Sequence, residues 1–543
     1  MKLYTIYINI ILILSLYQPL MAQYTRQDSL RGSLNHYRDY DVKHYDLKVS
    51  VWAEKKYISG SNEILLLTLH RTDTIQIDLF DNLTIDSIVY NAQKQKYIRE
   101  GNATFVYLNE AIKSKKLIAI TIYYHGNPII AKMAPWDGGF TFKKTKSNAD
   151  FIATSVQGIG ASLWWPCKDH LSDEPDSMLI SCTVPRGLMN VSNGRLINTQ
   201  HIENTSTFIW KVNYPINNYG VALNITAYEH WQDIYLSAGD TLTLDYYVLP
   251  ENLEKSKEWF QQVKPMLAAF EKRLGRFPFW KDGYKLVETP YLGMEHQSCI
   301  AYGNNYKKGY LGMDMSGQNL DFDYIIIHES GHEYWGNAVS MYDAAEMWIH
   351  EGFCTYSEGV YVEELYGYEV AMNYYKNQQT KVLNDRAIIE DFGVNAQPTG
   401  DQYFKGSLFL NTLRHVLNND SVWWRIIYDF ATTNVPRHAS TQDFIDLIHT
   451  HTGKDYTPIF NQYLRHAKLP KLHVKWSKEG RNTLLNCYWE CAEKDFEMPI
   501  KFYDGKRDHW ITVNTTPMKL RLKVNAEYVV FDQVHFYYDI VED

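Results

Sequence analysis

Hydrophobic positions change their spacing twice along the chain. From about residue 40 to residue 245, apolar side chains alternate with polar ones. The alternation is clearest in three segments, Tyr45 to Val51, Ile75 to Leu79 and Ile118 to Tyr124. A period of two is typical of strands with one buried face. We therefore expect residues 23–249 to form a large N-terminal β domain.

A helical spacing replaces this alternation near residue 250. Between Trp259 and Leu274 apolar residues recur every three or four positions, which predicts a helix. Pro265 should kink this helix because proline removes a backbone donor and clashes with the preceding turn. Gly275 should end it.

Helical segments continue to about residue 464, and short strand-like runs return after Pro470. We expect an α-rich domain over residues 250–468 and a small β domain over residues 469–543. The predicted fold class is therefore multidomain α+β, since long runs of strands and helices are segregated along the chain.

The first 22 residues have the pattern of a secretory signal peptide. Lys2 precedes an apolar run from Ile6 to Leu16, and the small residue Ala22 stands before a polar stretch. The run is short for a membrane span, although an uncleaved anchor is the alternative interpretation. We expect cleavage near Gln23, export to the periplasm or the medium, and no stable membrane span afterwards.

Composition narrows the function classes. The 543 residues exceed one typical core, and 45% hydrophobic with 22% charged residues is ordinary for a folded protein. A formal net charge of -9 argues against a nucleic-acid partner, which usually requires a basic face. Six cysteines in a chain this long do not make a disulfide scaffold. Cys487 and Cys491 could bridge a hairpin or remain free.

The most informative motif is His328-Glu329-Ser330-Gly331-His332. On a helix, residues four apart share a face, so both imidazoles can reach one metal ion. A catalytic zinc keeps three protein ligands and one open position, and Glu351 is the candidate for the third ligand. Glu329 can serve as general base without binding the metal. The sequence thus predicts one Zn²⁺ per chain; an exposed histidine pair without metal is the alternative.

This motif, with a glutamate eighteen residues after the second histidine, resembles the gluzincin pattern of the M1 zinc aminopeptidases. The residues around the ligands also resemble that family: Trp335-Gly336-Asn337 and Glu351-Gly352-Phe353. The resemblance implies an N-terminal β-saddle, a thermolysin-like catalytic domain and a C-terminal β-sandwich. Many members carry a further large helical domain. The chain ends at Asp543, so we expect that domain to be absent and the cleft to be more open.

The resemblance also assigns substrate-binding residues. Gly293-Met294-Glu295 resembles the family's G-x-M-E-N element, whose glutamate binds the N-terminal amine of the substrate. Leu292 and His296 depart from that element, so the resemblance does not fix the shape of the first pocket. Gln157 occupies a place where family members carry a glutamine or glutamate that contacts the same amine.

Tyr403-Phe404-Lys405-Gly406 resembles the family's Y-x-K-G segment, whose tyrosine donates its hydroxyl to the oxyanion. Glu358 lies about two helical turns beyond Glu351. It could orient a metal ligand, and it could equally be an exposed helix acid.

Together these residues predict an aminopeptidase that takes peptides with a free N-terminus. Glu329 and Tyr403 would act on the scissile bond, and Glu295 with Gln157 would fix the amine. A thermolysin-type endopeptidase needs no amine anchor, and a silent peptide-binding relative would usually have lost a ligand or the base. An epoxide hydrolase of the same family would carry the helical C-terminal domain. The oligomeric state is not indicated.

Overall fold

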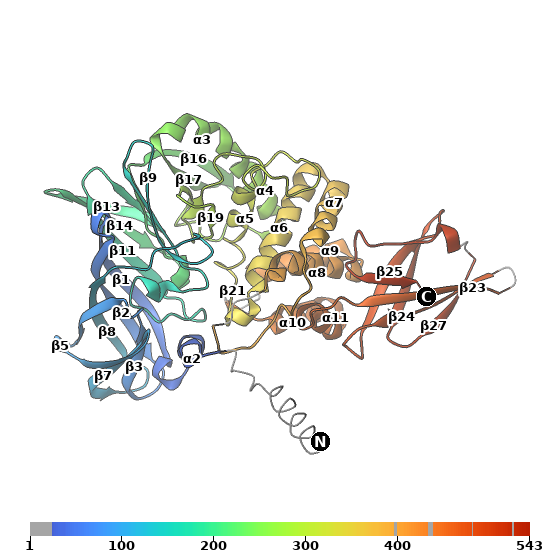
Figure 1. The fold of residues 1–543 in the computed structure, drawn as a ribbon, viewed down its shortest axis with the longest axis horizontal. Helices are drawn as coiled ribbons and strands as arrows, with labels where there is room; N and C mark the ends of the chain where they lie inside the picture. Colours follow the sequence, from blue (N-terminus) through green and yellow to red (C-terminus); the bar gives the residue numbers. More distant parts are fainter. Residues whose placement is uncertain (1–23, 396–398, 433–437, 480–481, 524–525, 543) are drawn as a thin grey trace, which may run out of the picture.

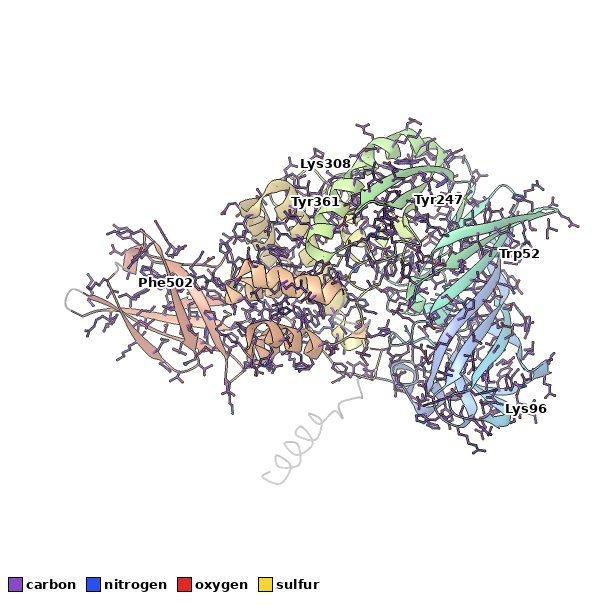
Figure 2. The ribbon with its side chains drawn as sticks, turned by 180° about the vertical axis from the view of Figure 1, so that it is seen from behind. Trp52, Lys96, Tyr247, Lys308, Tyr361 and Phe502 are labelled. Atoms are coloured by element: carbon purple, nitrogen blue, oxygen red, sulfur yellow. The ribbon has the colours of Figure 1, made fainter. Side chains whose placement is uncertain are left out.

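The computed structural model describes residues 24–395, 399–432, 438–479, 482–523 and 526–542 (Figure 1). The predicted signal peptide, residues 1–22, lies outside them. The described chain runs from strands through helices to strands, so the fold class is the predicted multidomain α+β. Figure 2 shows Trp52 in the first β region, Tyr361 among the helices and Phe502 in the last sheets.

The N-terminal β region contains three sheets. The largest has the strand order β13 (Arg195–Ile202), β14 (Thr205–Val212), β11 (Ser177–Pro185), β1 (Tyr40–Trp52), β2 (Tyr57–Thr68), β8 (Leu117–Gly126), β4 (Leu83–Tyr90) and β5 (Gln93–Lys94). A second has the order β12 (Met189–Val191), β15 (Asn224–Thr226), β10 (Asp150–Ser155) and β9 (Gly139–Lys144). The third has the order β3 (Thr72–Asp78), β7 (Ala103–Ile112) and β6 (Lys96–Glu100).

The alternating segments form strands as expected. In β1, Tyr45, Leu47, Val49 and Val51 are all buried while their neighbours are partly or fully exposed. The pairing of β1 with β2 is antiparallel, and a register irregularity lies between Val42 and His44. The strand alternation therefore covers one face with apolar side chains, which is what holds the sheet against its core.

The next sheet crosses the predicted boundary at residue 249/250. It has the order β16 (Glu229–Ser237), β17 (Asp240–Val248), β18 (Tyr284–Glu288), β20 (Ile300–Tyr302) and β19 (Gly293–Met294). Strand β17 runs parallel to β18, so the last strands before residue 250 join strands that follow it. The spacing of hydrophobic residues could not predict this pairing, because it does not identify the neighbouring strand.

The helical region has nine α-helices among the described residues. They are α3 (Leu253–Trp259), α4 (Val263–Leu274), α5 (Tyr324–Gly331), α6 (Trp348–Tyr366), α7 (Tyr368–Gln378), α8 (Asp401–Leu417), α9 (Asp420–Thr432), α10 (Thr441–Thr452) and α11 (Thr457–Leu464). The predicted kink at Pro265 is replaced by a break over residues 260–262, and Pro265 lies in the first turn of α4. Proline is tolerated there because those backbone donors have no partner in the helix. Gly275 caps α4 as expected.

Two sheets follow the helices. One has the order β27 (Met518–Leu522), β24 (Asn482–Glu490), β23 (Lys471–Glu479) and β29 (Asp539–Glu542), and the other β26 (Asp508–Asn514), β25 (Glu497–Tyr503) and β28 (Val530–Phe531). Cys487 on β24 and Cys491 just after it are both unpaired, as are the other four cysteines. The described residues include no helix of the length and apolar character that a membrane crossing requires.

Candidate metal centre and substrate cavity

Helix α5 places the two histidines of the motif. Asp323 caps it by accepting hydrogen bonds from the backbone N–H groups of Ile325 and Ile326 at 3.0 and 3.4 Å. His328 lies within the helix, and His332 follows its last residue with helical backbone angles. The His332 N–H donates to the His328 carbonyl at 3.3 Å, so the i, i+4 relation holds and both rings share one face.

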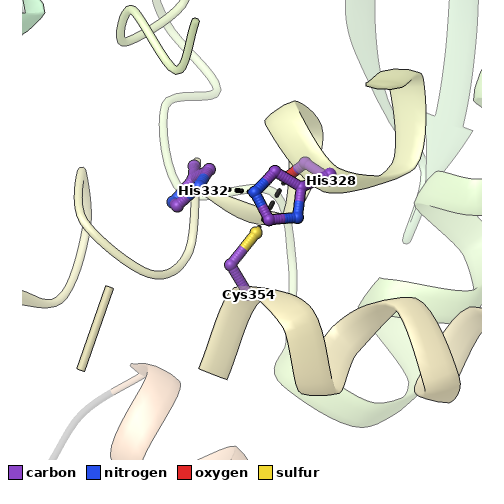
Figure 3. Close-up of side chains that lie close together, drawn as sticks. All are labelled: His328, His332 and Cys354. Carbon is purple, nitrogen blue, oxygen red and sulfur yellow. Dashed lines mark hydrogen bonds between the residues drawn. The ribbon is translucent and has the colours of Figure 1, made fainter. Parts of the chain in front are cut away.

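Three donor atoms converge between α5 and α6. Nε2 of His328 and Nε2 of His332 are 3.3 Å apart, and Figure 3 shows the two rings next to each other. Oε2 of Glu351, from the first turn of α6, lies 3.3 Å from His332 Nε2 and 3.8 Å from His328 Nε2. The structure therefore brings together all three residues that the sequence singled out as ligands.

The other nitrogen of each ring is held by an acceptor. His328 Nδ1 lies 2.7 Å from Oε1 of Glu358, and His332 Nδ1 lies 2.9 Å from the Trp335 carbonyl oxygen. An acceptor at Nδ1 places the proton there, which leaves a lone pair on Nε2 for a metal ion. Glu358 is fully buried and also accepts from the Tyr374 hydroxyl at 2.5 Å, so it orients a ligand and is not an exposed acid.

The donor set fits a zinc ion. Glu351 Oε2 is buried and has no hydrogen-bond partner among the described residues, although two imidazole nitrogens face it. A buried carboxylate oxygen without a partner is costly unless a cation satisfies it. Cys354 Sγ also lies within 4.8 Å of both rings, but its thiol donates to the His328 carbonyl at 2.8 Å (Figure 3). Glu351 is therefore the better third ligand.

Glu329 faces the same centre from the next position of α5. Its carboxylate, that of Glu295 and a ring nitrogen of His332 lie within 4.8 Å of one another. Burial raises the pKa of Glu329 to about 7. Gly293 on β19 makes room for this side chain, since a Cβ at Gly293 would lie 2.5 Å from Glu329 Oε1. Gly293, at the variable position of the G-x-M-E-N element, thus has a steric reason in this chain.

Glu295 and Gln157 meet beside the metal ligands. Gln157 Nε2 donates to Oε1 of Glu295 at 2.5 Å and to Oε1 of Glu351 at 3.1 Å. Asn337 donates to the Glu295 carbonyl at 2.9 Å and so fixes the backbone there. Glu295 is buried, and burial raises its pKa. The side chain of His296 is buried and does not line the cavity, whereas that of Leu292 does.

Tyr403 lies in the first turn of α8, with its ring stacked on that of His328 at a centroid distance of 6.1 Å. Burial and the Glu351 carboxylate raise the pKa of its hydroxyl, which keeps the proton in place for donation. Lys405 lies away from this centre. Its Nζ donates to the His466 and Ala467 carbonyls at 3.1 and 2.7 Å, so it ties α8 to the chain after α11.

A cavity of about 1020 Å³ surrounds these residues, at the junction of the N-terminal β region and the helices. All of the predicted site residues line it: Gln157, Gly293, Met294, Glu295, His328, Glu329, His332, Glu351 and Tyr403. Most of the charged groups on its wall are carboxylates, and Arg31 is the only lysine or arginine among the described residues there. Such a wall favours a cationic group on the ligand.

Many residues of this wall were not identified from the sequence, and Arg31 and Tyr219 are two that bear on the site. Arg31 comes from the short helix α2 (Arg26–Gly32), far from every motif. Tyr219 lies on a 3-10 turn of the β region, and its buried hydroxyl has no hydrogen-bond partner among the described residues. Neither belongs to a local pattern, so only the tertiary structure could identify them.

The chain matches a known protein-family model. The model of the peptidase family M1 domain matches residues 259–463, which include both histidines, Glu351 and Tyr403. The chain is similar to aminopeptidase N of Lactobacillus helveticus, with 21% identity over 82% of this chain and 53% of that protein. It is also similar to leucyl aminopeptidase of Saccharolobus solfataricus, with 19% identity over 62% of this chain and 44% of that protein. The chain thus spans about half the length of the curated relatives it matches.

Among solved structures, the fold is similar to that of an M1 zinc metallopeptidase from Deinococcus radiodurans. One such structure, a mutant bound to a Tyr-Ser-Ala substrate, gives a TM-score of 0.67 at 19% identity. The match covers 80% of this chain and 96% of that one. A second structure, of M1 zinc metallopeptidase from Deinococcus radiodurans, gives a TM-score of 0.66 at 18% identity, with 80% of this chain and 95% of that one covered. The arrangement of β region and helices is therefore shared with these enzymes.

Proposed function

Residues 259–463 match the model of the peptidase family M1 domain, and from this premise we propose that the chain is a zinc-dependent aminopeptidase acting on peptides with a free N-terminus. The observation that supports this most strongly is the contact between Glu295 and Gln157 beside the three candidate ligands. A carboxylate there can bind an ammonium group at a fixed distance from the metal. Only the first peptide bond would then reach the reacting groups.

His328, His332 and Glu351 would hold the zinc ion. When bound, zinc acts as a Lewis acid that polarises a carbonyl oxygen and lowers the pKa of water. Glu329 would accept the proton of the attacking water and pass it to the leaving amine. A general acid–base group works best when its pKa is close to the ambient pH, and burial raises the pKa of Glu329 in that direction. Tyr403 would donate a hydrogen bond to the oxyanion.

The amine anchor explains the direction of cleavage. Glu295 and the amide oxygen of Gln157 would accept hydrogen bonds from the substrate's ammonium group, and the carboxylate-rich wall would attract it. Peptides with an acetylated N-terminus lack this charge and should not be hydrolysed.

Turnover of aminoacyl amides, with and without a zinc chelator, tests the proposal. We expect chelator-sensitive release in the wild-type protein. The Glu329→Gln variant should keep its zinc and lose activity by about 10²–10⁴-fold, as expected for loss of a general base. Near wild-type turnover by this variant would contradict the assignment. Equal cleavage of free and acetylated peptides would instead indicate an endopeptidase, and bound zinc without turnover a silent relative.

We also propose that the protein is exported to the periplasm or the medium, on the signal-peptide pattern of residues 1–22. N-terminal sequencing of the protein recovered from each cell fraction tests this. A mature chain that begins near Gln23 in an exported fraction is the expected result, and retention of Met1 or Lys2 would contradict it.

A further inference from the structure

The N-terminal helix α2 contacts the loop that carries Gln157 through Arg31. Nη1 of Arg31 donates to the Gly158 carbonyl oxygen at 2.9 Å. Nε of the same guanidinium lies 3.2 Å from Oδ2 of Asp169. Arg31 therefore binds the residue next to Gln157 and, at the same time, an acid eleven residues further along the chain.

The loop is shaped around this guanidinium. Gly160 has φ of +100°, and a Cβ there would lie 2.2 Å from both Arg31 Nη2 and Asp169 Oδ2. Only glycine fits, because the position combines a left-handed backbone with this close approach. Asp169 is fixed in turn by Ser162, whose N–H and hydroxyl donate to Oδ2 at 3.2 and 2.6 Å.

The helix that provides Arg31 is itself anchored. Arg38 is fully buried, and its Nη1 donates to the carbonyls of Leu30 and Ser33, each at 3.2 Å. Its Nη2 donates to Oδ2 of Asp78 at 2.7 Å, and Gln76 also donates to the Leu30 carbonyl at 2.9 Å. These bonds satisfy the C-terminal carbonyls of α2, so the helix is a fixed support for Arg31.

The segment between α7 and α8 also contacts this loop. Asn395 Nδ2 donates to the Gly158 carbonyl oxygen at 3.4 Å, the atom that Arg31 binds. A Cβ at Gly32 would lie 2.5 Å from the backbone carbon of Val394, so α2 packs directly against this segment. In Figure 1, α2 lies at the edge of the β region that faces the helices. The Gly158 carbonyl therefore receives a donor from each side of the cavity.

We propose that Arg31 is a positioning residue for Gln157. By fixing the Gly158 carbonyl and Asp169, it holds the Gln157 amide in contact with Glu295 and Glu351. The ammonium site of the enzyme thus depends on a helix that precedes the first β-strand. This inference rests on the proposed function, because it gives Gln157 its role in binding the substrate amine.

The Arg31→Ala variant tests this, with Arg26→Ala as the matched control. Arg26 lies on the same helix and pairs with an acid, Glu100, but does not touch the loop. We expect Arg31→Ala to raise KM for aminoacyl amides by about tenfold or more, with kcat within about twofold, since misplaced binding groups weaken substrate fixation. The inhibition constant of a free amino acid should rise by the same factor. Arg31→Lys should give an intermediate increase in KM, because a lysine ammonium can replace one of the two contacts but not both contacts of the planar guanidinium.

A double-mutant cycle separates positioning from general structural support. If Arg31 acts through Gln157, then Arg31→Ala should add little to the effect of Gln157→Ala, since the group it positions is already gone. Zinc content and melting temperature of Arg31→Ala should stay close to those of Arg26→Ala. If Arg31 merely stabilised the fold, Arg31→Ala would lower the melting temperature relative to Arg26→Ala, and its effect would add to that of Gln157→Ala.

The outcomes distinguish this inference from the proposed function. An active wild-type enzyme in which Gln157→Ala is impaired and Arg31→Ala is silent, or in which the two effects add fully, overturns the role of Arg31 alone. Wild-type protein that binds zinc and hydrolyses no aminoacyl amide overturns the proposed function. A KM increase in Arg31→Ala that disappears in the Gln157→Ala background supports both.

Discussion

Glu358 is the residue whose role the sequence left open and the structure decides. It is fully buried on α6, and its two carboxylate oxygens accept from His328 Nδ1 and from the Tyr374 hydroxyl. An acid in this place fixes the ring orientation of a metal ligand and makes Nε2 a stronger donor. The metal centre therefore extends beyond the three ligands to Glu358, which lies about two helical turns after Glu351 on α6.

Removing that carboxylate should weaken metal binding without touching a ligand. We expect Glu358→Ala to lower zinc affinity by about 10–100-fold, the usual cost of losing a residue that supports a ligand. Competition with a chromogenic chelator measures this affinity. Tyr374→Phe removes only one bond to Glu358 and should give a smaller loss. Unchanged zinc affinity in Glu358→Ala would mean that His328 needs no support at Nδ1.

The residues that sequence analysis could identify are those tied by local spacing. His328, Glu329 and His332 share one turn of helix, and the helix itself brings two of them to one face. The role of Glu358 was decided, and Tyr219 was recognised, only from their contacts, because these depend on how α6 and the β region pack. A linear pattern carries no information about such packing.

At the scale of elements, two glycines decide how close Tyr403 comes to the metal ligands. Gly352 lies one residue after Glu351 on α6, and Gly406 lies three residues after Tyr403 on α8. A Cβ at Gly406 would lie 3.0 Å from Gly352 Cα, and one at Gly352 would lie 3.2 Å from Gly406 Cα. The motifs that contain these glycines thus encode a close crossing of two helices.

The Gly406→Ala variant should disturb this crossing. Alanine gains about 0.5–1 kcal/mol of helix stability over glycine, but overpacking in a tight contact costs about 1–3 kcal/mol. We expect a net loss of about 1 kcal/mol in the free energy of unfolding and a fall in kcat as Tyr403 moves away. Chemical denaturation and steady-state kinetics measure the two effects.

Gly400→Ala is the control for this prediction. Gly400 directly precedes α8, has helical backbone angles, and a Cβ there would meet no atom within 4 Å. This variant should be neutral or slightly more stable, because alanine restricts the unfolded chain. Equal kinetic effects in the two variants would show that the α6–α8 contact does not control Tyr403.

The same scale shows where prediction from sequence stopped. The spacing of hydrophobic residues predicted whether a segment forms a strand or a helix, as β1 and α4 illustrate. The partner of β17 did not, because parallel pairing with β18 joins segments on both sides of the helices α3 and α4. Sheet neighbours are set by tertiary contacts, and the period of a strand is the same whichever strand it pairs with.

At the scale of the whole molecule, the helices and the C-terminal sheets share one hydrophobic core. Buried residues from α8 and α11 belong to the same cluster as Phe496 and Phe536. Hydrogen bonds cross the same junction. The Tyr463 hydroxyl donates to the Tyr537 carbonyl at 2.6 Å, and the Tyr537 N–H donates to the Thr412 hydroxyl at 2.9 Å. The C-terminal sheets therefore support the helix that carries Tyr403.

A chain that ends at residue 468 should accordingly lose stability in its catalytic part. Removing the sheets exposes apolar surface at about 25 cal/mol per Å² and leaves polar groups such as the Tyr463 hydroxyl without their partners. We expect the full-length helical region and C-terminal sheets to unfold in one cooperative calorimetric transition, and the truncated chain to melt at a lower temperature. None of the described residues of the C-terminal sheets lines the cavity, so we expect any loss of activity to act through α8. Two separate transitions, with the catalytic one unchanged by truncation, would instead show that the sheets are an independent unit.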